Sequence, residues 1–168
     1  MTHQKTSRPG RSPYITAGGF LALQKESTAL WERRRVVTRA LAAAAAEGDR
    51  SENAEYIYRK KELREIDRRL RYLQKRLPAL KVVDEIPGDP ERVFFGARVT
   101  LEDPRGNELS FRIVGSDEFD PARNWISVDS PMARAVLNRE VDDKVVVQTP
   151  AGEARYLICG IEYMICLL

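Results

Sequence analysis

Between residues 55 and 80 the chain reads EYIYRKKELREIDRRLRYLQKRLPAL, and this stretch decides the fold. Apolar side chains recur in it at alternating intervals of three and four residues, the spacing of one apolar stripe on a helix. A stripe with this regular rhythm predicts packing against a second helix. Its members are Leu63, Ile66, Leu70, Leu73, Leu77 and Leu80, and Tyr56 extends it by one heptad toward the N-terminus.

The partner helix precedes this stretch in the chain. The same rhythm is followed by Phe20, Leu23, Ser27, Leu30, Arg34, Val37, Leu41 and Ala44, with Thr16 as a plausible N-cap before them. Because only a few residues separate the two stripes, we expect an antiparallel coiled-coil hairpin over residues 14–83. At about 1.5 Å per residue, arms of about 30 residues would extend about 45 Å.

An acidic turn, residues 47–56 (EGDRSENAEY), joins the two helices and contains Asp49 and Glu52. On a helical turn this spacing of three would place both carboxylates on one face, where they could offer oxygens to Mg²⁺. The same pattern also fits a capping box, with Asp49 as N-cap and Glu52 reaching back. The two interpretations are compatible, and the spacing alone does not choose between them.

Positive charge is concentrated on the returning helix. Residues 59–76 hold nine basic side chains and three acidic ones, and a basic face runs beside the apolar stripe. A charge run on a helix is often only a solvated face. Here the excess favours a surface that faces a polyanion, most simply a nucleic-acid backbone. The predicted nucleic-acid-binding residues are Arg59, Lys60, Lys61, Arg64, Arg68 and Arg71.

The remaining segments predict a tail, a linker and a second domain. Residues 1–13 are polar and are expected to be disordered, and Pro87, Gly88 and Pro90 mark a linker over residues 84–92. Residues 93–168 alternate between turns and strand-like runs, one of which is at residues 125–128. One short helix is opened by Ser130 and Pro131. The overall fold class is therefore α+β with two domains, the second a twisted antiparallel sheet packed on a short helix.

Composition excludes several functional classes. The single histidine, His3, and the two cysteines, Cys159 and Cys166, cannot assemble a zinc site or a Ser-His or Cys-His catalytic set. Apolar runs are too short to span a bilayer, and the N-terminus has no signal region. We expect the chain to be a cytoplasmic monomer that does not bind a membrane. We also expect that it binds no cofactor by itself.

Several motifs resemble a known family. The segment from Gly48 to Tyr56, followed by Lys60-Lys61 and residues 63–69, is similar to the tip and returning helix of bacterial Gre transcript cleavage factors of the GreB type. Further similar segments are residues 93–97, 111–115, 126–135 and 149–154, so the resemblance covers about residues 14–165 in order. One departure is Val141-Asp142-Asp143, where the family usually has Val-Gly-Asp.

The resemblance implies a function and roles for particular residues. The second domain would have an FKBP-like fold and bind bacterial RNA polymerase, with Asp129, Ser130 and Pro131 at the rim of its secondary channel. The hairpin would enter that channel, where Asp49 and Glu52 would act as catalytic tip carboxylates that share Mg²⁺ with the polymerase. The polymerase would then cut the nascent RNA 3′ end of a backtracked complex. The chain would be an accessory factor and not itself an enzyme.

Two other functions are compatible with parts of the sequence. A channel-binding inhibitor on the same scaffold would block the polymerase without promoting cleavage, but both tip carboxylates are present here. A peptidyl-prolyl isomerase is suggested only by the FKBP-like fold, and fold by itself is weak evidence for activity.

Overall fold

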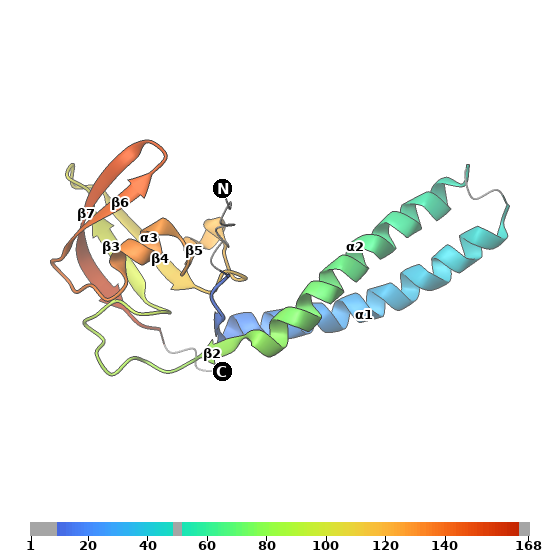
Figure 1. The fold of residues 1–168 in the computed structure, drawn as a ribbon, viewed down its shortest axis with the longest axis horizontal. Helices are drawn as coiled ribbons and strands as arrows, with labels where there is room; N and C mark the ends of the chain where they lie inside the picture. Colours follow the sequence, from blue (N-terminus) through green and yellow to red (C-terminus); the bar gives the residue numbers. More distant parts are fainter. Residues whose placement is uncertain (1–9, 49–51, 165–168) are drawn as a thin grey trace, which may run out of the picture. The chain divides into compact units, whose positions relative to one another are not determined.

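The computed structural model describes residues 10–48 and 52–164, which form two compact units (Figure 1). One unit is Phe20–Leu80 and the other combines Met1–Gly19 with Lys81–Leu168. Residues 14–19 and 81–83, which the sequence assigns to the hairpin, therefore group with the sheet. The expected fold class is present, a helical hairpin and a separate sheet with a short helix.

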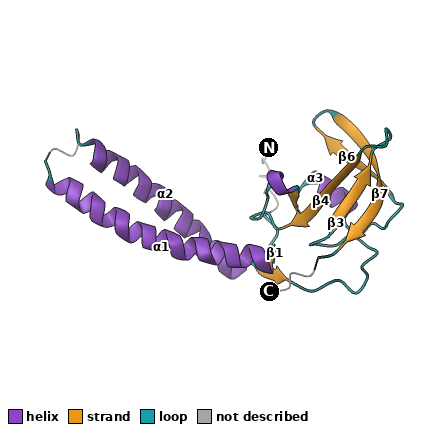
Figure 2. Ribbon diagram, turned by 180° about the vertical axis from the view of Figure 1, so that it is seen from behind, coloured by secondary structure: helices purple, strands orange, loops and turns teal. Residues whose placement is uncertain are grey.

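The hairpin unit consists of two antiparallel helices (Figure 2). Helix α1 spans Ala17–Ala46, helix α2 spans Ala54–Arg76, and a 3₁₀ turn, η1, follows at Leu77–Ala79. Pro78 lies in η1, consistent with a residue that lacks an N–H and cannot continue an α-helix. The predicted stripes form the packed seam, because their buried members are Leu23, Val37 and Ala44 on α1 and Ile66, Leu70 and Leu73 on α2.

Ion pairs connect the two helices along the seam. Arg34 Nε lies 2.7 Å from Asp67 Oδ1, and Arg69 donates to both Glu26 oxygens, at 2.6 and 2.8 Å. Exposed pairs of this kind contribute about 0–1 kcal/mol each, so they favour the antiparallel register more than they stabilise the fold. Apolar burial at the seam must supply most of the stability of the hairpin.

Glu62 forms an ion pair within α2 as well as one across the seam. Its carboxylate accepts hydrogen bonds from Arg33 of α1 and from Arg59 of α2, at 2.7 and 3.1 Å. Desolvation opposes ionisation of this group, but the two arginines outweigh it and hold the pKa of Glu62 below its ordinary value. The pKa of Arg59 is raised by its hydrogen bond to Glu55 and, second, by the one to Glu62.

The other unit is built on a five-stranded sheet in the order β5-β4-β3-β7-β6, with a separate parallel pair, β1-β2. The strands are β1 Tyr14–Thr16, β2 Lys81–Val83, β3 Arg98–Glu102, β4 Glu108–Val114, β5 Trp125–Ser127, β6 Lys144–Thr149 and β7 Gly152–Glu162. One 3₁₀ turn, η2, spans Pro121–Arg123, and the short helix α3 spans Pro131–Val136.

The sheet is mixed, whereas the sequence predicted an antiparallel one. Strand β5 runs parallel to β4, with Ile113 paired to Ile126, while the other pairs in the sheet are antiparallel. The chain between β4 and β5 passes through η2 and then re-enters in the same direction, which a tight hairpin turn cannot do. The predicted run at 125–128 therefore exists as a strand, but its direction differs.

One face of the sheet packs on α3 and forms the core. Leu101, Ile113 and Ile158 are fully buried, and α3 contributes Ala133 and Val136 to the same cluster. Along β3 the buried residues alternate with partly exposed ones, as expected when one face of a strand is covered. This packed layer supports the start of α3, where the predicted polymerase-contact residues Asp129, Ser130 and Pro131 lie.

A buried carboxylate anchors the start of α1 to the sheet unit. Glu118 accepts hydrogen bonds from the N–H groups of Thr16 and Gly115, at 3.0 and 2.9 Å, and from the Thr16 hydroxyl. That hydroxyl oxygen in turn accepts from Gly19 N at 3.1 Å, which confirms Thr16 as the N-cap. A Cβ on Gly19 would lie 2.2 Å from Glu118, so glycine is required by the close approach.

The turn that departs from the family pattern keeps a left-handed backbone. Asp142 has φ of 70°, and its N–H donates to Ile158 O at 2.9 Å. Because a β-branched residue is strained at positive φ, we expect Asp142→Val to lower the free energy of unfolding by about 1–2 kcal/mol. Asp142→Gly should not lower it, since glycine adopts this conformation freely. Urea unfolding of both variants would test this, and equal losses would contradict it.

Candidate functional site

The tip turn is closed by Asn53, which lies between the two helices. Its side-chain Oδ1 accepts from Tyr56 N at 3.1 Å and caps α2, while its Nδ2 donates to Ala44 O at 3.0 Å near the end of α1. The Ala44 carbonyl belongs to the last turn of α1, where the regular helical donors are missing, and it also accepts from Glu47 N at 3.3 Å. One side chain therefore satisfies a group on each helix and ties the two ends together.

This arrangement corrects two expectations for the acidic turn. The capping box was wrong, because Asn53 and not Asp49 is the N-cap of α2. Glu52 precedes this cap and is exposed, so it does not stand on a helical face. Asp49 lies outside the described residues, and its proposed partnership with Glu52 stays a prediction.

We expect Asn53→Ala to loosen the tip. Loss of the cap should cost about 1 kcal/mol, and the Ala44 carbonyl would keep only its longer hydrogen bond from Glu47 N, at 3.3 Å. Asn53→Asp is the matched variant, since it keeps the capping acceptor and removes only the donor to Ala44. Amide hydrogen exchange should show faster exchange at 54–57 in Asn53→Ala than in Asn53→Asp. Equal exchange in both variants would show that the cap does not hold the tip.

The described residues do not include a complete metal-binding group. Among the residues that the structure describes, no group of three or more His, Cys, Asp or Glu side chains could hold an ion. Glu52 together with Asp49 would offer two carboxylates, and Mg²⁺ typically takes one or two of these with waters and phosphate oxygens.

The predicted basic residues lie along α2, and all but one of them are exposed to solvent. Lys60, Lys61, Arg64, Arg68 and Arg71 are exposed. Arg59 is half-buried and forms ion pairs with Glu55 at 2.7 Å and Glu62 at 3.1 Å. Because two carboxylates already neutralise it, Arg59 contributes less positive field than the sequence suggested.

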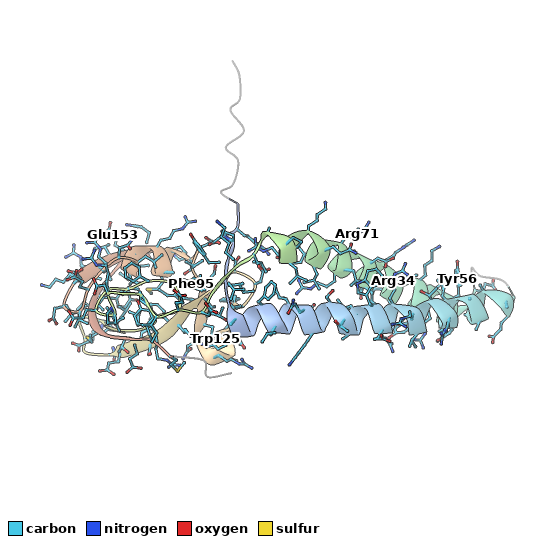
Figure 3. The ribbon with its side chains drawn as sticks, turned by 90° about the horizontal axis from the view of Figure 1, so that it is seen from below. Arg34, Tyr56, Arg71, Phe95, Trp125 and Glu153 are labelled. Carbon is cyan, nitrogen blue, oxygen red and sulfur yellow. The ribbon has the colours of Figure 1, made fainter. Side chains whose placement is uncertain are left out.

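The structure adds Trp31, a residue of α1 that the sequence did not single out as a binding residue. Trp31 and Arg34 line a groove of about 550 Å³ together with Arg64, Arg68 and Arg71 of α2. Figure 3 shows Arg34 and Arg71 projecting from the two helices, with Tyr56 nearer the tip. One signal was available in the sequence, since Trp31 is a large aromatic residue outside the apolar stripe. The groove itself depends on how the helices pack.

The predicted contact residues at 129–131 start helix α3 in the sheet unit. Ser130 is the N-cap and accepts from Ala133 N at 3.2 Å, and Pro131 is exposed at the first helical position. Asp129 Oδ2 accepts from Ser12 N at 2.9 Å, so it also holds the segment before β1. These three residues and the tip belong to different units.

Two family descriptions match this chain in succession. "Transcription elongation factor, N-terminal" matches residues 13–82, and "Transcription elongation factor, GreA/GreB, C-term" matches residues 88–163. The two matches follow the hairpin and the sheet unit in order.

Full-length relatives agree with these matches. A transcription elongation factor GreB from Yersinia pestis is 58% identical over 91% of this chain and 90% of its own length. One from Pseudomonas aeruginosa is 54% identical over 97% and 98% of the two chains. A crystal structure of GreA factor homolog 1 from Thermus thermophilus is 27% identical, covers 90% of this chain and 99% of its own, and has a TM-score of 0.43.

The fold and the sequence matches together define a two-unit transcription factor with a helical hairpin. The chain belongs to the GreA/GreB family of transcription elongation factors, and its full-length relatives place it with the GreB type. No helix within residues 10–48 and 52–164 is long and apolar enough to cross a membrane.

Proposed function

We propose that this chain rescues backtracked bacterial RNA polymerase by stimulating the polymerase's own cleavage of the nascent RNA 3′ end. The observation that carries this proposal is family membership over both units, combined with a narrow hairpin that has carboxylates at its tip sequence. The chain would act in the bacterial cytoplasm as a monomer. It would be an accessory factor, and the polymerase would supply the catalytic centre.

The hairpin is suited to reach a recessed site. Its two helices are joined by a short turn, and Asn53 holds their ends together at that turn. A two-helix rod can enter a channel that a whole domain cannot, while the sheet unit stays outside. We infer that Asp129, Ser130 and Pro131 contact the rim of the secondary channel, where the exposed Pro131 offers a rigid apolar surface.

At the polymerase active site, Asp49 and Glu52 would hold a second Mg²⁺ jointly with polymerase carboxylates and RNA phosphate. When bound there, such an ion stabilises developing charge and activates water for phosphodiester hydrolysis. Glu52 is exposed and is not the residue that caps α2, so its oxygens can turn toward such an ion. The chain's own contribution is to bring negative charge to the right place, which suits its lack of any other predicted catalytic set.

A cleavage assay tests the proposal directly. Backtracked elongation complexes assembled from purified polymerase, template and labelled RNA should release short 3′ fragments faster when this chain is added. Extension should then resume on addition of nucleotides. If the chain instead slows cleavage and extension, it is an inhibitor on the same scaffold.

A further inference from the structure

The groove between α1 and α2 has a composition that the proposed RNA-facing surface does not by itself explain. Trp31 lies at its wall with 42% of its surface exposed, a large fraction for a tryptophan. Leu70 contributes a buried apolar floor, and Gln74 adds an amide. A purely electrostatic contact with phosphates would need none of these groups.

The indole is held in place by charge. The Arg34 guanidinium carbon lies 5.9 Å from the centre of the Trp31 ring, within the range of a cation–π contact. Arg34 is itself fixed by Asp67, with Nε and Oδ1 2.7 Å apart. This chain of contacts restrains the ring without covering it, and a restrained aromatic ring loses little entropy when a second flat group stacks on it.

The opposite wall of the groove is positively charged. Arg64, Arg68 and Arg71 occupy successive turns of α2, about 4.5–6 Å apart along the helix axis. In the part of the chain that the structure describes, Arg64 and Arg68 form no ion pair, and Arg71 Nε donates only to the backbone oxygen of Asp67, at 3.3 Å. Three guanidinium groups on successive turns are therefore available to pair with phosphates.

We propose that this groove is a nucleotide-binding subsite for single-stranded RNA, in which one base stacks on Trp31 and the flanking phosphates pair with Arg64, Arg68 and Arg71. The volume of about 550 Å³ is in the range of small-molecule sites, about 300–1,000 Å³, and accommodates one nucleotide. Stacking tolerates any base but requires an unpaired one, whereas the charged wall recognises phosphate. The inference rests on the proposed function for its RNA partner, and it assigns the selectivity for unpaired RNA to Trp31.

Fluorescence of the full chain tests the stacking. The chain has two tryptophans, so the variant Trp125→Phe leaves Trp31 as the single indole. Short single-stranded RNA should quench its emission saturably. Duplex RNA of the same length and inorganic polyphosphate should quench it weakly, because neither offers a free base face. Absence of quenching by single-stranded RNA up to about millimolar concentration, or equal quenching by all three, overturns the proposal.

Measurements of RNA affinity on variants distinguish the role of Trp31 from that of the arginine wall. Trp31→Leu should weaken binding of an end-labelled single-stranded RNA by about 5- to 100-fold, since base stacking contributes about 1–3 kcal/mol. Its salt dependence should not change, because no phosphate contact is lost. Arg68→Gln should instead reduce the slope of log affinity against log salt by about one. Val36→Ala changes an exposed apolar residue of α1, the helix that carries Trp31, and this variant should bind RNA like the parent chain.

The outcomes distinguish this inference from the proposed function. If Trp31→Leu binds RNA like the parent, the groove holds no stacked base, and an acidic protein surface becomes its better partner. Tip-dependent cleavage could still be intact in that case. Conversely, if cleavage is not stimulated at all but Trp31 is quenched by single-stranded RNA, the proposed function fails and the nucleotide subsite stands.

Discussion

Replacing both tip carboxylates, Asp49→Asn with Glu52→Gln, should abolish stimulated RNA cleavage by this chain. Held jointly with the polymerase, a second Mg²⁺ contributes several kcal/mol of charge stabilisation, and each 1.4 kcal/mol is a factor of ten in rate. We therefore expect a loss of about 100-fold or more in the rate of 3′ fragment release. Amides match the carboxylates in shape, so the hairpin should fold unchanged.

Two controls make this result specific. Competition against the unmodified chain should show that the doubly substituted chain still occupies the polymerase, because the proposed rim contacts at 129–131 are untouched. Glu55→Gln is the matched control within the same acidic segment. Its carboxylate already pairs with Arg59, at 2.7 Å, and its substitution should have little effect on cleavage. If the tip double variant cleaves like the parent, the mechanism proposed here is wrong.

Reversing three charges of the basic face, with Lys60, Arg64 and Arg68 all changed to Glu, should impair the rescue of deeply backtracked complexes. All three side chains are exposed, and reversal replaces attraction to phosphates with repulsion. We expect about a 10- to 100-fold higher concentration for half-maximal cleavage of long backtracked RNA. Shallowly backtracked complexes should be less affected, because less extruded RNA reaches the hairpin. Added salt should lower the activity of the parent chain and narrow the difference.

A control variant tests whether the change in net charge by itself causes the impairment. Reversal of Arg105, Arg139 and Lys144 changes the total charge by the same amount on exposed residues of the sheet unit. That variant should rescue deeply backtracked complexes at the same concentrations as the parent chain. Equal impairment at every backtrack length in the hairpin variant would instead point to a docking or folding defect, which urea unfolding would reveal.

Much of the hairpin could be predicted from residue spacing. A 3-4 rhythm specifies which face of a helix is apolar, and a short connection makes two such faces meet, so the seam from Leu23 to Leu73 follows from local pattern. The sheet was harder to predict. Strand β5 was placed correctly along the chain, but its direction depends on the path through η2, which no alternation of apolar residues encodes.

Capping at the tip could not be assigned from the pattern because the sequence offers several acceptors. Asp49, Ser51, Glu52 and Asn53 all precede the apolar rhythm of α2, and each type can cap or support a helix start. Asn53 alone among the carboxylates and amides there supplies a donor as well as an acceptor, and packing places the Ala44 carbonyl within its reach. The contact between the two helices therefore determines which of these residues caps α2.

The sequence by itself determined the hairpin, the presence of carboxylates at its turn, the basic face of α2 and the family. Each of these depends on residue type and on spacing along one helix, which are local properties. Only the tertiary structure decided that Arg59 is neutralised, that Glu118 anchors Thr16, and that Trp31 shares a groove with arginines of the other helix. These features join residues that are distant in the chain, and their contacts follow from packing geometry that no periodicity specifies.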